Sequence, residues 1–157
     1  MKILLIETGK TRDINIQNMV QDYYNRINHY LVFTIKTIPD LKNTRNLSTD
    51  QVKQKEAEMI LKEIQPSDHV VLLDENGRQR TSVDFAGHLQ NLMNRGLKQT
   101  VFIIGGAYGF DPSVYGRANE KIGLSRMTFS HQIIRPIFTE QLYRAFTILR
   151  NEPYHHQ

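Results

Sequence analysis

Hydrophobic positions along the chain follow two spacings that alternate from one end to the other. Apolar runs with strand character, typical of buried β-strands, occur at residues 3–6, 31–38, 69–73 and 100–104. Between them, apolar residues recur at helical spacing from Ile14 to about His29, after Ser48 and after Ser82. This alternation predicts an α/β protein with a mostly parallel sheet and helices on both faces. No linker or internal repeat divides the chain, so we expect one domain over residues 1–157.

Local signals set the expected boundaries of several elements. Ser48 and Gln51 form a capping-box pattern, Ser82 is expected to cap a helix that stops at Gly96, and Asp111-Pro112 suits a helix start. Polar residues 40–47 predict a surface loop, for which a solvated connection is favoured over an RNA contact. We also predict turns at residues 75–78 and 121–123, a short strand at 124–128 and a final helix at 133–149.

A glycine-rich stretch, TVFIIGGAYGFDP at residues 100–112, is the first candidate for a binding site. Gly105 and Gly106 follow a buried strand, and glycines at such a strand end let the backbone approach a ligand closely. In α/β sheets this end is also where crevices form. The stretch matches neither the dinucleotide nor the phosphate-loop motif, so an ordinary strand-to-helix turn remains the alternative. Asp74, at the end of the preceding strand, could bind a ligand or cap a turn.

Composition narrows the classes of function. The net charge of +4 is compatible with a phosphate-rich partner, and the absence of cysteine removes thiol nucleophiles and disulfides. The chain lacks a signal peptide and a membrane-spanning apolar segment, so we expect a cytoplasmic protein without a membrane partner. His155 and His156 are adjacent but have no third ligand at suitable spacing, so we expect no metal.

The final helix carries a group of charged residues without a recognisable catalytic pattern. Glu140 and Arg144 are one turn apart, a spacing that permits an intrahelical ion pair. A solvated helix face is the default interpretation of such residues. Neither a Ser/His/Asp order nor an HExxH motif is present, so these residues alone identify no enzyme.

Three segments taken together, FIIGGAYGF, GLSRMTFSH and the closing EQLYRAFTILRNEPYHHQ, are far more specific. In this order they resemble the ribosomal RNA large subunit methyltransferase H family of the SPOUT methyltransferases, and the likeness extends over the full length. The resemblance implies a C-terminal deep trefoil knot, a rare exception to the rule against threaded connections. It also implies an obligate homodimer that binds S-adenosyl-L-methionine. The expected product is N3-methylpseudouridine in a 23S rRNA stem-loop near the decoding centre, formed in the ribosome, most simply the assembled 70S particle.

The same resemblance assigns site residues. It implies a cofactor pocket at Leu73, Gly105, Gly106, Leu124, Ser125, Arg126, Met127, Thr128 and Phe129. Tyr154 and His155 resemble the family terminus that reaches the catalytic pocket across the dimer, and Arg144 resembles a substrate-side residue. Two departures, Ala107-Tyr108 and His156-Gln157, stand where some relatives have proline-glutamate and a basic end.

Roles for these residues follow from the chemistry of the expected reaction. Methyl transfer to N3 needs alignment and loss of a weakly acidic proton. His155 is the candidate base, because an imidazole ordinarily titrates near neutral pH, and Arg144 is the candidate for binding phosphate or stabilising charge. Basic residues expected to attract the rRNA are Lys10, Arg12, Lys42, Arg45, Arg78 and Arg80. Two alternatives remain: a tRNA ribose methyltransferase of the same superfamily, and a non-catalytic RNA-binding module with this fold.

Overall fold

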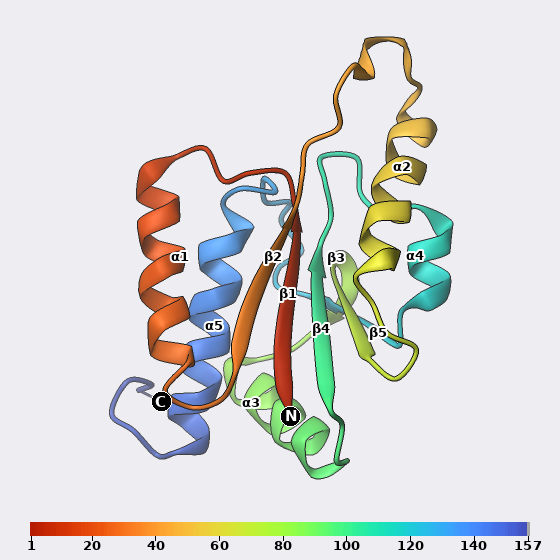
Figure 1. The fold of residues 1–157 in the computed structure, drawn as a ribbon. Coiled ribbons are helices and arrows are strands. Elements are labelled where there is room, and N and C mark those ends of the chain that lie inside the picture. Colours follow the sequence, from red (N-terminus) through yellow and green to blue (C-terminus); the bar gives the residue numbers. More distant parts are fainter. Residues whose placement is uncertain (157) are drawn as a thin grey trace.

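The computed structural model describes residues 1–156, and Gln157 lies outside the described part of the chain. The strands form one sheet in the order β2-β1-β4-β3-β5, and every neighbouring pair is parallel (Figure 1). In chain order the elements are β1 (Lys2–Thr8), α1 (Ile14–Ile27), β2 (Phe33–Ile38), a 3-10 turn (Thr44–Asn46), α2 (Thr49–Lys62), β3 (His69–Gln79), α3 (Ser82–Asn94), β4 (Gln99–Ile104), α4 (Pro112–Arg117), β5 (Glu120–Gly123) and α5 (Ile134–Leu149).

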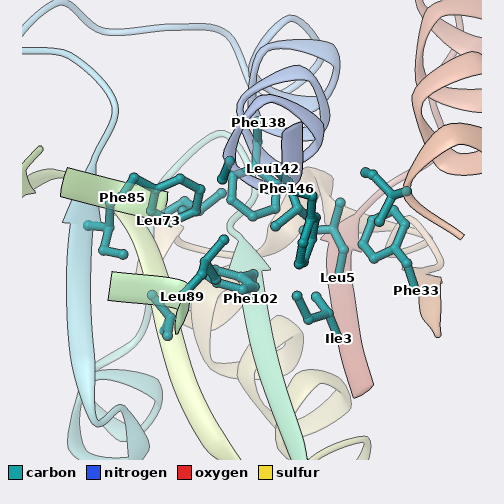
Figure 2. Packing of buried hydrophobic residues seen from close by; sticks show 14 of the residues in the cluster. Ile3, Leu5, Phe33, Leu73, Phe85, Leu89, Phe102, Phe138, Leu142 and Phe146 are labelled. Carbon is teal, nitrogen blue, oxygen red and sulfur yellow. The ribbon is translucent and has the colours of Figure 1, made fainter. Parts of the chain in front are cut away.

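Helices cover both faces of this sheet, as the sequence predicted. Successive strand side chains point to opposite faces, so each strand contributes to two cores. On one face Phe102 packs against Phe85 and Phe138, which come from α3 and α5 (Figure 2). On the other face Val101 and its neighbours pack with α2 and α4, for example with Ile60. The α/β class and the parallel sheet are therefore confirmed.

Most predicted helix starts are confirmed, and one is wrong by a residue. The capping box of Ser48 and Gln51 is present, and Asp111 caps α4 ahead of Pro112. The cap of α3, however, is Thr81 and not Ser82. The Thr81 hydroxyl accepts the backbone N–H of Asp84, whereas the Ser82 hydroxyl donates to Gln141 of α5, 2.8 Å away. Both residues are competent caps, and tertiary packing decides which one serves.

Two predicted turns are strands instead. β3 continues through residues 75–78 to Gln79, with a shift in register between Leu73 and Arg78. Residues 121–123 pair with it as β5, while 124–128, predicted as a strand, are irregular. The reason lies in Gly77, because a Cβ there would lie 2.5 Å from a backbone carbon of Ile122. The lack of a side chain lets the two backbones pair this closely, and that contact is not local in sequence.

Replacing Gly77 by alanine is expected to lower the free energy of unfolding by about 1–3 kcal/mol, as overpacking typically does. The Cβ would meet backbone, which cannot rotate away as a side chain can. Gly87 offers a matched control, because a Cβ at this helical glycine would meet nothing within 4 Å. Gly87→Ala is expected to raise stability by about 0.5–1 kcal/mol. Urea unfolding of both variants measures the difference, and equal stabilities would contradict this account of β5.

Candidate active site

A cavity of about 710 Å³ opens at the carboxyl edge of β3, β4 and β5. Its walls come from the end of β4, the turn at 105–110, the outer part of β3 and the irregular segment 124–131. The turn is closed by a hydrogen bond from the Gly109 N–H to the Gly106 carbonyl, with Gly109 at φ +77°. The volume of the cavity is within the range usual for small-molecule sites, about 300–1,000 Å³.

The segments expected to bind a cofactor meet around this cavity. Its lining contains eight of the nine residues implied by the resemblance: Leu73, Gly105, Gly106, Leu124, Ser125, Met127, Thr128 and Phe129. Arg126 is not part of the lining and is exposed to solvent. Residues 105–106 and 124–129 are therefore neighbours in space, although about twenty residues separate them in the chain. The structure thus brings together what the sequence could only propose to be adjacent.

The glycine pair also has a local reason within the protein, beside the prediction that it leaves room for a bound cofactor. A Cβ on Gly105 would lie 3.1 Å from the Phe110 ring, and one on Gly106 would lie 2.7 Å from a carboxylate oxygen of Glu56. Protein side chains therefore already occupy the space beside both glycines, and the backbone itself forms the cavity wall.

Acidic side chains that the resemblance did not assign also line the cavity. Tyr115 donates a hydrogen bond to Asp74 at 2.5 Å, and Thr128 donates one to Glu75 at 2.5 Å. Burial, together with the bond to Asp74, raises the pKa of Tyr115 to about 12, so the phenol stays protonated as a donor. Of these residues only Asp74 gave a sequence signal, as a carboxylate after a buried strand. Tyr115 and Glu75 gave none, because their places depend on how β3 and α4 pack.

The residues of the cavity fit S-adenosyl-L-methionine. Leu73, Ile104, Ile122 and Leu124 supply an apolar region suited to an adenine ring, and exposed backbone near the turn can read its edge. Carboxylates at Asp74 and Glu75 suit a ligand with a positive sulfonium and ammonium. The cavity therefore has an apolar region for the adenine and an acidic region for the positively charged groups of the cofactor.

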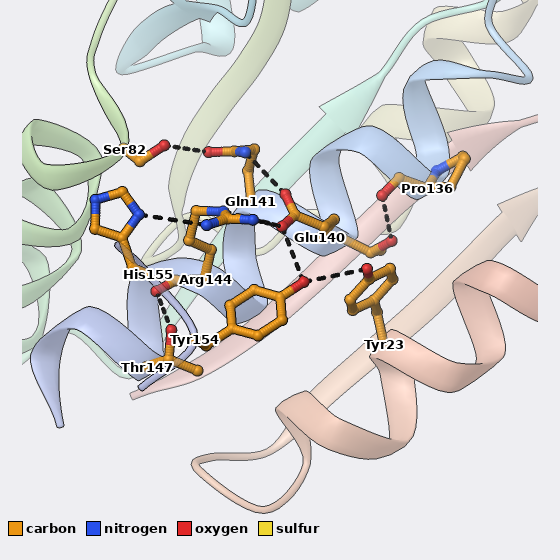
Figure 3. A network of polar contacts seen from close by, with 10 residues as sticks. Tyr23, Ser82, Pro136, Glu140, Gln141, Arg144, Thr147, Tyr154 and His155 are labelled. Atoms are coloured by element: carbon orange, nitrogen blue, oxygen red, sulfur yellow. Dashed lines mark hydrogen bonds and ion pairs between the residues drawn. The ribbon is translucent and has the colours of Figure 1, made fainter. Parts of the chain in front are cut away.

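A second cluster forms where the chain end folds back on α5 (Figure 3). Glu140 accepts hydrogen bonds from Arg144, at 2.9 and 2.5 Å, and from the Tyr154 hydroxyl at 3.1 Å. The Arg144 guanidinium also lies over the Tyr154 ring, 4.7 Å from its centre, and 3.3 Å from Nδ1 of His155. The predicted ion pair of Glu140 and Arg144 is confirmed, and Tyr23 of α1 joins the cluster through Tyr154, 3.3 Å away.

Protonation in this cluster follows from these contacts. Burial and the contacts with Tyr23 and Glu140 raise the pKa of Tyr154, and the hydrogen bond to Glu140 raises that of Arg144. Tyr154 is therefore a donor and Arg144 a cation at neutral pH. Because a guanidinium only donates, Nδ1 of His155 accepts in this contact, and Nε2 of the neutral ring carries the proton. His155 can accept a proton at Nδ1 only when this contact opens.

The two clusters lie apart within one chain. Ile134, at the start of α5, lines the cavity, whereas Arg144 comes ten residues later. At 1.5 Å per residue, this places Arg144 roughly 15 Å farther along the helix axis. The last described residues contact Tyr23 and Tyr30, in α1 and just after it, and in Figure 1 they lie toward the end of the sheet where the strands begin, opposite the carboxyl edge. Arg144, Tyr154 and His155 are absent from the lining of their own chain's cavity.

Two kinds of feature are absent from residues 1–156: a metal centre and a membrane-crossing helix. No three His, Asp or Glu side chains within that range are grouped so that they could hold a metal ion. Among the described residues, none of the helices combines the length and the hydropathy that a membrane span requires. The polar contact of the His155 imidazole is with the Arg144 guanidinium, which is a cation and not a metal ligand.

Comparison with known proteins agrees with this geometry. Residues 1–155 match the family described as predicted SPOUT methyltransferase. Proteins named Ribosomal RNA large subunit methyltransferase H from Christiangramia forsetii, Flavobacterium psychrophilum and Parabacteroides distasonis are 55%, 54% and 54% identical over 157 residues, 100% of this chain and of each relative. The chain therefore belongs to the SPOUT methyltransferase family, with the ribosomal RNA large subunit methyltransferase H proteins as its full-length relatives.

Proposed function

We propose that this protein transfers a methyl group from S-adenosyl-L-methionine to N3 of a pseudouridine in 23S rRNA of the large ribosomal subunit. The observation that carries the proposal is the cavity in which residues 105–106 and 124–129 meet, in a chain of this family. The names of the full-length relatives support large-subunit rRNA as the substrate class. The position of the methyl group, the 70S ribosome as substrate and a cytoplasmic location rest on the resemblance alone.

We further propose that the active site is composite, formed between two copies of the chain. Within one chain Arg144 lies far along α5 from the cavity, and the chain end is at the other end of the sheet. A homodimer that places the end of one protomer against the cavity of its partner would unite the two clusters. The trefoil knot remains an expectation from family membership, which would fix the irregular segment 124–133 around the cofactor.

The chemistry that the bound cofactor supplies is a methyl group activated as a sulfonium. Leu73, Ile104 and Leu124 would hold the adenine and keep water from the reacting atoms. Arg144, fixed by Glu140, would place a positive charge beside the base or its phosphate and favour the anion formed when N3 loses its proton. His155 would take that proton at Nδ1 after leaving Arg144, or orient the base through Nε2–H.

A test of the function compares rRNA and tRNA from wild-type and deletion strains by mass spectrometry. The deletion strain should lack one methyl group on a 23S pseudouridine, and the purified protein should restore it to isolated ribosomes. Loss of a tRNA ribose methyl group would instead favour the tRNA enzyme. Calorimetry distinguishes an enzyme from a non-catalytic RNA-binding module with this fold, because such a module should not bind S-adenosyl-L-methionine.

Replacing His155 by alanine is expected to lower the single-turnover methylation rate by about 10²–10⁴-fold, the usual contribution of a positioned acid or base. Affinity for the cofactor should change less than about twofold, because the proposed role of His155 is toward the base and it is not among the residues predicted to hold the cofactor. His156→Ala is the matched control on the neighbouring imidazole. An unchanged rate in the His155 variant would remove this residue from the chemistry.

A further inference from the structure

A second chamber of about 420 Å³ adjoins the cofactor cavity. The two share Gly106, Ala107, Tyr108 and His131 in their linings, so the turn after β4 separates them as a common wall. Lys10, Arg12, Asp40 and Glu56 complete the chamber's charged groups together with Asp13. A ligand in this chamber would lie next to whatever occupies the larger cavity.

The loop that leads from β1 to α1 is fixed beside this chamber by its backbone. The Gln132 side chain accepts the Arg12 N–H at 3.1 Å and donates to the Lys10 carbonyl at 3.0 Å. Gln17 donates to the Thr11 carbonyl at 2.6 Å, and Asp13 caps α1. These bonds use backbone groups of the loop, so they position the cationic side chains without engaging them.

The cationic side chains of this loop have no ionic partner in the described part of the chain. Lys10 and Arg12 are exposed at the rim of the chamber, and neither forms an ion pair within residues 1–156. By contrast Arg80, another residue expected to attract rRNA, lies 3.7 Å from Glu120 and is partly shielded. Two adjacent, pre-positioned cations suit phosphate groups.

The inner end of the chamber carries a carboxylate. Glu56 is half-buried next to Gly106, and its carboxylate has no hydrogen-bond partner within residues 1–156. Burial, assisted by the negative charge of Asp40, raises the pKa of Glu56. Its carboxylate is therefore available to a ligand in the chamber that donates an N–H, and hydrogen bonds to a charged acceptor are stronger than those between neutral groups.

We propose that this chamber receives the target nucleotide: Lys10 and Arg12 bind phosphates of the RNA strand, and Glu56 accepts an N–H of the uracil-type base. The proposal rests on the function proposed above and adds to it the residues that select and orient the substrate. Pseudouridine has two ring N–H groups, at N1 and N3, so one can bond to Glu56 while the other faces the methyl donor. The partner's chain end would close over the base.

The order of charges favours a nucleotide over the methionine end of the cofactor, which also carries both signs. Lys10 and Arg12 lie at the exposed rim together with Asp13 and Asp40, whereas Glu56 is half-buried beside the shared wall. An RNA strand that enters from solvent has its phosphates outside and its base inside, which matches this order. A methionine end entering from the cofactor side would meet Glu56 first, and its carboxylate would have to extend to the exposed rim to reach a cation.

The test uses four variants of the full-length protein, one of them the conservative Glu56→Gln, and two binding measurements. The double variant Lys10→Ala/Arg12→Ala removes the phosphate contacts, and Glu56→Leu removes the acceptor. Lys55→Ala/Lys62→Ala removes the same net charge from exposed positions of α2 that lie outside the chamber. Affinity for ribosomes from the deletion strain is measured by sedimentation without cofactor, and affinity for S-adenosyl-L-methionine by calorimetry without RNA; methylation kinetics follow.

The Lys10/Arg12 variant is expected to weaken ribosome binding and raise KM at least tenfold, with a shallower dependence of affinity on salt. Glu56→Leu is expected to lower kcat/KM about 10- to 100-fold, and Glu56→Gln to keep much of the activity, since an amide oxygen still accepts an N–H. Cofactor affinity should remain within about twofold in all variants, and the control should behave as wild type.

Three results would overturn the proposal. A fall in cofactor affinity without RNA in the Glu56 variant would assign the chamber to the methionine end. Unchanged ribosome affinity and kinetics in both chamber variants, with an active wild type, would place the nucleotide elsewhere while leaving the methyltransferase function intact. A wild-type protein that binds S-adenosyl-L-methionine but methylates no large-subunit RNA would refute the proposed function and this inference together.

Discussion

Replacing Arg135 by leucine is expected to lower the free energy of unfolding by about 3–5 kcal/mol, the usual effect of breaking a buried ion pair. Arg135 is fully buried, 3.3 Å from the Glu7 carboxylate. It also donates to the carbonyls of Thr8 and His131 and to the Thr11 hydroxyl, at 2.7, 2.9 and 2.6 Å. Its loss would leave a buried charge and three acceptors without their donor.

Urea unfolding measures this effect, and two further variants separate charge from geometry. Arg135→Lys keeps the charge but cannot reach all acceptors with one planar group, so an intermediate loss is expected. Glu7→Gln/Arg135→Met removes both charges and should recover part of the stability lost in Arg135→Leu. An Arg135→Leu protein within about 1 kcal/mol of wild type would contradict this view of the buried pair.

The same pair gives a pH dependence with a defined sign. Burial raises the pKa of Glu7, and Arg135 opposes that rise. A carboxyl whose folded pKa is raised favours folding when protonated, and this contribution is lost as pH increases through the raised value. Removing Arg135 raises the pKa further. The destabilisation by Arg135→Leu is therefore expected to be larger near pH 8 than near pH 5. An equal loss of unfolding free energy at both pH values would show that the ionisation of Glu7 does not cause the pH dependence.

Mixing two inactive variants is expected to restore activity if the active site is shared between protomers. Arg144→Ala should lower the methylation rate by about 10²–10³-fold through loss of a positioned cation, with cofactor affinity unchanged. Leu124→Arg should block cofactor binding, because Leu124 lines the cavity. In a mixed dimer, one site combines an intact cavity with an intact chain end. Random exchange should then yield about a quarter of wild-type activity, since half of the dimers are mixed and each has one working site.

The complementation experiment has an outcome that excludes the shared site. If each cavity used its own chain's Arg144, no dimer in the mixture would contain a complete site, and activity would stay at the level of the separate variants. Calorimetry on Leu124→Arg and on Arg144→Ala provides the control, since only the first should lose cofactor binding. A mixture of Arg144→Ala with His155→Ala should stay inactive when sites are shared, because both lesions lie at the chain end.

Helix caps and alternating elements were predictable because their causes are local. The capping box of Ser48 and Gln51 spans three residues, and the start of α4 depends on Asp111-Pro112. The prediction of a turn at 121–123 was wrong because β5 depends on Gly77, more than forty residues earlier. Local patterns contain no information about that pairing.

The sequence by itself determined the class of the protein: apolar periodicity predicts a parallel α/β sheet, and three ordered segments resemble one methyltransferase family. Only the tertiary structure decided which charged residues share a chamber. Lys10 lies in the loop after β1 and Glu56 in α2, and nothing in the sequence pattern links the two, yet the fold places both in the lining of one chamber with Gly106. It also placed Arg144 and His155 away from the cavity of their own chain. The physical reason is that a site is made by side chains that packing brings together, and packing depends on contacts distant in sequence.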